Sequence, residues 1–206
     1  MAHIPEGVLT PQVLIGGGVM TASLLTLALR RIDYDRLPHA AVLSAAFFVS
    51  SLISVPLGPT SVHLLLNGLM GLLLGWTAVP AILVALALQA AFFGFGGPLV
   101  LGVNTLNMAL PALMCAWLLA PALGHAPPAR RVWIGFGAGL LGVMLTGMLV
   151  AATLALSGEP FRPAAKILAL TYPPLALVEG LITATIVGFL QRVAPEILSP
   201  GANLHD

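Results

Sequence analysis

Long apolar runs divide this chain, and short stretches rich in proline, glycine and charge separate them. The runs are apolar on every face rather than at alternate positions, which indicates helices and not the strands of a membrane barrel. Several approach the roughly 20 residues that a helix needs to cross a bilayer. The pattern predicts helical spans over residues 11–29, 40–56, 61–76, 79–95, 104–123, 132–156 and 172–192.

The boundary between the third and fourth spans leaves an alternative open. Only residues 76–80 separate these spans, and a proline such as Pro80 can lie inside a membrane helix. One merged span is therefore the alternative to two. The second to fourth spans are short, so tilt, re-entry or burial within the bundle would also suit them.

Composition excludes a water-soluble fold. Hydrophobic residues make up 59% of the 206 positions and charged residues 7%, whereas soluble domains carry roughly 25% charged residues. We therefore expect an all-α, polytopic membrane bundle of about seven transmembrane helices, formed as one domain over residues 1–206. The lone Cys115 cannot form an intrachain disulfide, and a net charge of +1 argues against nucleic acid as a partner.

The basic residues orient the predicted spans. Arg162 and Lys166 fall on one side of the membrane, in the predicted loop 157–171. The others fall on the opposite side: Arg30, Arg31, Arg36, Arg130, Arg131 and Arg192. Because short cytoplasmic loops carry the excess of Lys and Arg, this distribution predicts an outside N-terminus and a cytoplasmic C-terminus.

Small residues recur four positions apart, a spacing that lets membrane helices approach closely. The pairs are Gly71 with Gly75, Gly135 with Gly139, and Ala138 with Gly142. Packing inside the bundle is the simpler interpretation, and docking against another membrane subunit is the alternative.

The common catalytic motifs are missing from the sequence. There is no G-x-x-x-x-G-K-[ST] loop, so a partner must bind the nucleotide if ATP drives transport. H-E-x-x-H and G-x-S-x-G are also absent, which removes the commonest zinc-protease and serine-hydrolase signatures. These absences favour a protein that is not an enzyme.

The N-terminus carries the first candidate metal ligand, His3. Residues 1–7 contain no Lys or Arg, unlike a secretory signal, so we expect the mature protein to keep them, apart from a removable Met1. An N-terminal amine, the amide nitrogens after it and an imidazole can form fused chelate rings on one ion. Such planar nitrogen sites are typical of Cu(II) or Ni(II), and Co(II) forms them less readily. With Met1 retained, the amine, two amides and His3 complete the plane; with Met1 removed, Ala2 supplies the amine and one position stays open.

His63 is the second candidate ligand. On a helix over 61–76 it would share a face with Asn67, four residues further on. His63 could fill the open position, with Asn67 as a supporting group, and a histidine satisfied by a backbone carbonyl is the alternative. The remaining histidines are expected to be solvated on the inner side: His39, His125 and His205.

Three further polar residues lie in the predicted spans. Asn104 and Asn107 open the fifth span, where they could cap the helix or bind the N-terminal segment. Glu179 lies inside the last span, where an unpaired carboxylate would be costly. It must face the bundle, be protonated or pair with a polar partner, which the sequence does not name, in either a structural or a functional role.

The predicted orientation brings these features to one level. His3, His63 and Asn104 fall at the outer surface of the bundle, and Glu179 falls in its outer half. We therefore expect a site for an external metal ion or small cation.

Four blocks of sequence resemble the CbiM/NikM family, the substrate-binding components of energy-coupling factor transporters for cobalt and nickel. The blocks are residues 1–7 (MAHIPEG), 61–68 (SVHLLLNG), 102–109 (GVNTLNMA) and 179–183 (EGLIT). The resemblance implies seven helices in the cell (inner) membrane, with the N-terminal segment inserted from outside. It implies import of Co(II) or Ni(II) for uses such as cobalamin biosynthesis, with no organic cofactor. We favour cobalt, because the first block is closer to the CbiM branch.

The resemblance also implies ligands and partners. The terminal amine, the first amide and two histidines hold the metal, which here means Met1 or Ala2, His3 and His63. The implied partners are a CbiQ-type membrane coupling protein, CbiO-type ATPases and often a small CbiN-type membrane protein. Ala2 departs from the family, which places His directly after Met. Removal of Met1 would restore the family spacing, and we expect it, whereas retention would put the role of His63 in doubt.

Three alternative functions stay open from the residues alone. The chain could bind an organic vitamin, although 6% aromatic residues give little support for a large aromatic cavity. It could be an intramembrane enzyme that uses His63 and Glu179. It could also be a structural membrane subunit that binds no metal.

Overall fold

Helices form most of the protein, as the apolar runs predict. The computed structural model describes residues 3–57 and 60–198. The α-helices are α1 (Pro11–Leu29), α2 (Leu37–Ser50), α3 (Asn67–Leu74), α4 (Ala78–Phe93), α5 (Leu101–His125), α6 (Pro128–Leu156) and α7 (Arg162–Val193). Short 3-10 helices are η1 (Tyr34–Arg36), η2 (Gly75–Thr77), η3 (Glu159–Phe161) and η4 (Pro195–Leu198).

The protein is a multi-pass membrane bundle. Within the described residues, five segments are helical, long and apolar enough to cross a membrane: 11–29, 67–93, 101–125, 128–156 and 159–193. α2 is apolar but has only 14 residues. Segment 67–93 covers the third and fourth predicted spans, but it is not one merged span, because the ring of Phe95, just after α4, lies only 6.4 Å from the ring of His63, just before α3. Gly75 interrupts the segment, because its positive φ of 56° breaks the helix.

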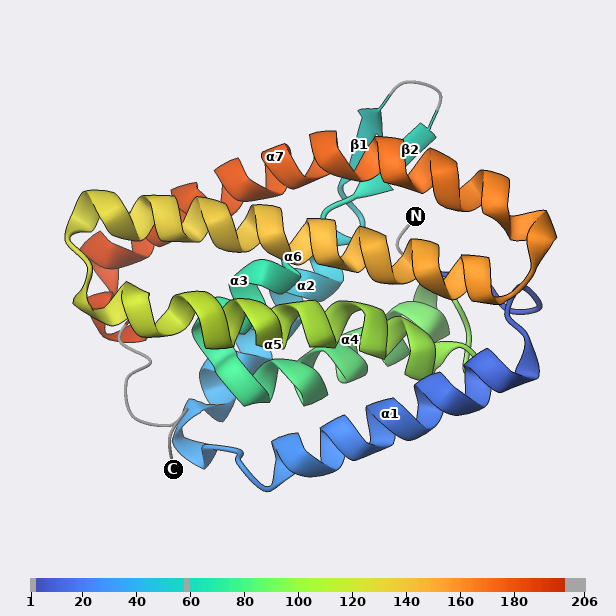
Figure 1. The fold of residues 1–206 in the computed structure, drawn as a ribbon. Coiled ribbons are helices and arrows are strands. Elements are labelled where there is room, and N and C mark those ends of the chain that lie inside the picture. The colour runs from blue at the N-terminus through green and yellow to red at the C-terminus, as the bar shows by residue number, and fades with distance from the viewer. Residues whose placement is uncertain (1–2, 58–59, 199–206) are drawn as a thin grey trace.

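A β-hairpin corrects the prediction of helix over residues 54–56 and 61–63. Strand β1 (Ser54–Leu57) pairs antiparallel with β2 (Thr60–His63), so that Ser54 lies opposite His63. β-branched residues such as Val55 and Val62 favour strands, and Pro56 cannot donate a helical hydrogen bond. Figure 1 shows the hairpin projecting past α7 at the edge of the bundle.

The hairpin also changes how His63 relates to Asn67. His63 ends a strand, and Asn67 is the first residue of α3. The prediction that the two side chains share one helical face is therefore wrong.

Helix α7 begins ten residues before the predicted start of the last span at residue 172. It starts at Arg162, so Arg162 and Lys166 lie on a helix rather than in a loop. Pro163 is compatible with this start because the first helical turn needs no N–H from proline. Helices α6 and α7 lie side by side along most of their length (Figure 1).

Glycines let α3 pass through the centre of the bundle. Every residue of α3 is buried. A Cβ at Gly68 would collide with the carbonyl of Ala138 in α6, and one at Gly71 would collide with the carbonyl of Ala112 in α5. Gly139 is pressed in the same way against the backbone of Glu179 in α7. The small residues at these crossings therefore pack the bundle internally, which places the start of α3 beside α7.

Candidate metal centre

The segment before α1 is held against α5 by a pair of hydrogen bonds. The backbone N–H of Ile4 donates to Oδ1 of Asn104 (3.1 Å), and Nδ2 of Asn104 donates to the carbonyl of Ile4 (3.1 Å). Both residues are buried. Asn104 lies within the first turn of α5, which starts at Leu101. The capping alternative for Asn104 is therefore wrong, and its bonds to the N-terminal segment are confirmed.

A second contact fixes the same segment to the loop between α4 and α5. The carboxylate of Glu6 accepts a hydrogen bond from the N–H of Leu99 (3.0 Å). The side chain of Glu6 packs directly over Gly97, where no Cβ would fit. Residues 4 and 6 are thus tied to two elements far along the chain, and His3 is carried with them into the interior.

His63 presents a free ring nitrogen. Its Nδ1 lies 3.0 Å from the carbonyl of Leu64, and a carbonyl can only accept, so Nδ1 carries the proton. In a neutral imidazole the other nitrogen, Nε2, then keeps its lone pair. This Nε2 is buried and has no hydrogen-bond partner among the described residues. Metal-binding histidines commonly have this arrangement, in which the second nitrogen donates to a carbonyl.

His3 and His63 lie against each other. Their ring centroids are 4.9 Å apart, with 33° between the ring planes, and the residues are 5% and 8% exposed. Burial, together with the neighbouring His63, lowers the pKa of His3 from its usual 6.5 to about 3. Burial also lowers the pKa of His63, although the hydrogen bond to Leu64 opposes the shift. Both rings are therefore neutral at physiological pH, the state in which imidazole binds metal.

Each histidine of this pair has a buried ring nitrogen without a hydrogen-bond partner among the described residues. Nε2 of His3, like that of His63, is buried without a partner in residues 3–57 and 60–198. Leaving a buried polar atom unpaired costs on the order of 1–3 kcal/mol. A bound cation would remove that penalty at Nε2 of His63, whereas a chelate that includes the amide of His3 would use Nδ1 of the His3 ring.

Glu179 supports the His63 region through the backbone. Its carboxylate accepts hydrogen bonds from the N–H groups of Leu65 and Leu66, at 3.1 and 3.2 Å for Leu66. Helix α3 starts at the next residue, so the carboxylate satisfies N–H groups that a helix start leaves unpaired. Leu66 has a left-handed φ of 49°, a conformation that costs about 1–2 kcal/mol for a residue with a Cβ. Glu179 therefore pairs with polar backbone groups, and these belong to the second and third residues after His63.

The two remaining asparagines play different parts. Nδ2 of Asn67 donates to Oγ1 of Thr146 (2.8 Å) and to the carbonyl of Met108 (3.2 Å), so it joins α3 to α6 and α5 rather than supporting the His63 ring. Oδ1 of Asn107 accepts from Oγ1 of Thr153 (3.3 Å). Its buried Nδ2 has no partner in the described part of the chain.

Side chains alone do not complete a metal site here. Among the described residues, no group of three or more His, Cys, Asp or Glu side chains could hold an ion together. Two imidazoles would need further nitrogens from the backbone and the terminal amine. Met1 and Ala2, which would supply them, lie outside the described residues.

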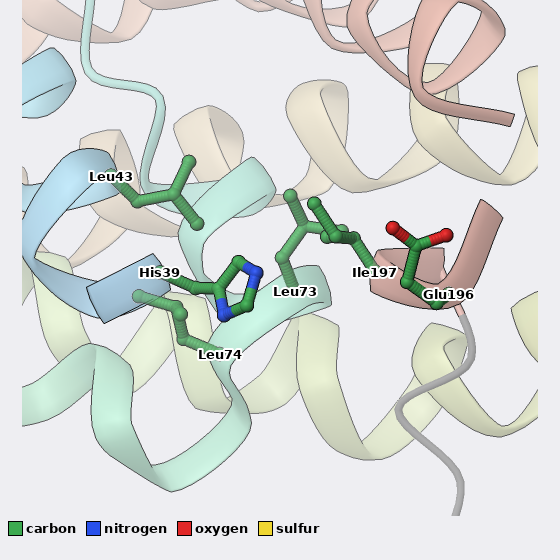
Figure 2. Close-up of a pocket in the computed structure, with 6 residues that line it drawn as sticks. All are labelled: His39, Leu43, Leu73, Leu74, Glu196 and Ile197. Atoms are coloured by element: carbon green, nitrogen blue, oxygen red, sulfur yellow. The ribbon is translucent and has the colours of Figure 1, made fainter. Parts of the chain in front are cut away.

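The other described histidines lie apart from this pair. His125 is at the end of α5 and His39 near the start of α2, while His205 is outside the described residues. His39 borders a cavity of about 200 Å³, shown in Figure 2, whose other walls are Leu43, Leu73, Leu74, Glu196 and Ile197. Residues 39 to 50 of α2 separate this cavity from the His63 region, a distance of about 16 Å at 1.5 Å per residue.

Phe95 belongs to the site, and the sequence prediction did not include it. Its ring centroid is 5.6 Å from that of His3 and 6.4 Å from that of His63. The one available signal was a single aromatic residue among glycines in the loop, Gly94-Phe95-Gly96-Gly97.

The chain is similar over nearly its whole length to known metal transport proteins. The CbiM family model, described as a cobalt uptake substrate-specific transmembrane region, matches residues 3–197. A Haemophilus influenzae protein, whose name assigns it provisionally to metal transport, is 38% identical over 98% of both chains. The fused nickel transport protein NikMN of Rhodobacter capsulatus is 34% identical over 96% of this chain, which spans 64% of that protein. A crystal structure of a transition metal transporter has a TM-score of 0.74 and 27% identity, and covers 99% of this chain and 100% of its own.

Proposed function

Because the chain belongs to the CbiM family and is a membrane component of cobalt or nickel transport, we propose that it captures Co(II) or Ni(II) through a chelate at its N-terminus. The ligands are the amine of the N-terminal residue, the amide and imidazole nitrogens of His3, and Nε2 of His63. The observation that carries the proposal is the buried, neutral His3–His63 pair, in which Nε2 of His63 has no partner among the described residues.

The N-terminal residue sets the geometry of this chelate. With Met1 removed, the amine of Ala2, two nitrogens of His3 and one of His63 make four donors, which suits planar coordination. With Met1 retained, the N-terminal residues alone would fill the plane and exclude His63. The closeness of the two histidine rings supports the first arrangement, because it brings His63 to the same ion.

The membrane arrangement and partners form the second part of the proposal. The bundle has seven helices, with the N-terminus and metal site outside and the C-terminus in the cytoplasm. It forms one domain in the cell (inner) membrane. The chain has no P-loop, so ATPases of the CbiO type drive import through a CbiQ-type coupling protein, with a CbiN-type protein as a further partner.

Intact mass and bound-metal analysis of the purified protein with an untagged N-terminus test this proposal. We expect loss of Met1 and one Co or Ni per chain. If metal is bound while Met1 is present, the fourth coordinating nitrogen comes from the N-terminal residues and not from His63. Absence of both metals in either processing state would refute the chelate.

A further inference from the structure

The ring of Phe95 lies along both histidines of the candidate site. Its plane is inclined by 29° to the ring of His3 and by only 4° to that of His63. The ring of Phe93, at 5.6 Å, lies beside Phe95, and Phe48 stacks on Phe93 at 5.1 Å. A nearly parallel hydrocarbon surface, braced by α4 and α2, therefore flanks the imidazole pair.

The loop around Phe95 is built to hold this position. Gly94 and Gly96 have φ values of 66° and 79°, which a residue with a Cβ adopts only under strain. A Cβ at Gly96 would lie 2.8 Å from Nδ2 of Asn104, the atom that binds the carbonyl of Ile4. The loop and the N-terminal segment therefore form one packed unit, and Phe95 and His3 are fixed relative to each other.

The geometry of the proposed chelate would place the ring of Phe95 over one side of the bound ion. An amine, amide and imidazole that chelate one ion place the imidazole of His3 close to the coordination plane. A ring that lies along that imidazole therefore covers one side of the plane. Water reaching the ion from that side would add a ligand and open a route for ligand exchange.

We propose that Phe95 is a specificity and retention residue that covers one face of the His3–His63 pair and keeps water from the bound ion. This inference rests on the proposed function. It assigns to an apolar side chain the control of ligand number and of the rate at which the ion leaves.

Nickel release provides the test. The untagged protein in detergent is loaded with Ni(II), excess EDTA is added, and release is followed together with the visible spectrum and magnetic moment. We expect Phe95→Leu to release Ni(II) about tenfold faster, as outer groups commonly tune metal affinity by 10–100-fold. The spectrum should also shift from planar, diamagnetic Ni(II) toward a paramagnetic form with added water.

Two further variants make the result interpretable. Phe95→Tyr keeps the flat ring and should retain the slow release of the parent protein. Phe92→Ala removes an exposed ring that contacts Phe48, and should leave both release and spectrum unchanged.

The outcomes separate the two proposals. If Phe95→Leu keeps the parent rate and spectrum, the cover is refuted and the chelate stands. If the parent protein binds Ni(II) with a six-coordinate, paramagnetic spectrum, the cover is also refuted. If the parent protein binds neither Ni(II) nor Co(II), the proposed function fails first.

Discussion

Two histidine-containing regions of this protein differ in a way that separates the proposed binding site from a cavity. His39 borders an open space of about 200 Å³ beside Glu196 (Figure 2), and it is exposed. His3 and His63 are buried, with 5% and 8% of each residue exposed. The histidine that borders this cavity is thus one that solvent already reaches.

Preorganisation distinguishes the proposed site from the region of His39. The region of His3 and His63 is held by Asn104, Glu6 and Glu179 through hydrogen bonds to backbone groups. These bonds fix the imidazoles before any ion arrives, so the cost of ordering them is already met by the fold. Four walls of the His39 cavity are aliphatic, and among the described residues no hydrogen bond holds the His39 ring in a similar way.

Substitution of His3 should cause the largest loss of metal affinity and so remove the difference between the two regions. We expect His3→Ala to weaken Co(II) or Ni(II) binding by more than about a hundredfold, above the 10–100-fold range of groups that only support ligands. Titration calorimetry on the untagged protein measures this change. Unchanged affinity, with the protein still inserted in the membrane, would eliminate His3 as a ligand.

Loss of the Glu179 carboxylate should have the next largest effect. Glu179→Ala leaves the N–H groups of Leu65 and Leu66 unpaired, at about 1–3 kcal/mol for each buried group. The path of the chain between His63 and α3 then relaxes, and we expect roughly a 10–100-fold loss of metal affinity. Metal titration with a thermal unfolding scan separates the two effects. Glu196→Ala is the matched control, and an equal loss there would show that the effect is not local.

Asn104→Ala should give a smaller effect at the same end of the molecule. It removes both hydrogen bonds to Ile4, so the N-terminal segment becomes harder to hold in place. We expect about a tenfold loss of affinity, at the lower limit for supporting groups. The readout is calorimetry, with Asn107→Ala compared in parallel. Asn104→Ala binding as tightly as the parent protein would mean that the segment needs no anchor on α5.

Substitution of His39 should have the smallest effect. We expect His39→Ala to change metal affinity by less than about twofold, because roughly 16 Å of helix α2 lies between His39 and Ser50, which contacts the residue after His63. The same calorimetric titration measures it. A tenfold loss of metal affinity would mean that the cavity of Figure 2 contributes to metal binding, and the distinction between the two regions would be wrong.

Part of the candidate site could be predicted from sequence and part could not. Polar residues are so scarce in this apolar chain that His3, His63, Asn104 and Glu179 stood out by type alone. Their partners did not, because a hydrogen bond such as that between Glu179 and Leu66 joins positions 113 residues apart. Asn67 shows the opposite error, since its spacing from His63 suggested a helical neighbour where the structure has a strand end.

Phe95 illustrates a different limit. Its sequence context shows a flexible, glycine-rich loop, and nothing in that context indicates which ring it will contact. Only the packing of Gly96 against Asn104 and of Glu6 over Gly97 brings the loop to the N-terminal segment. Sequence therefore shows residues that are unusual for their surroundings, and aromatic residues in an apolar chain are not unusual.

The sequence by itself determined the membrane bundle, the family and the identity of the polar residues, because all three depend on composition, run length and local motifs. It also located most helix ends, with α1 predicted at the observed residues 11–29. The tertiary structure decided the hairpin, the broken passage of α3 through the bundle and the contact between His3 and His63. These depend on close approaches between distant segments, at Gly68, Gly71 and Gly139, whose fit no local pattern encodes.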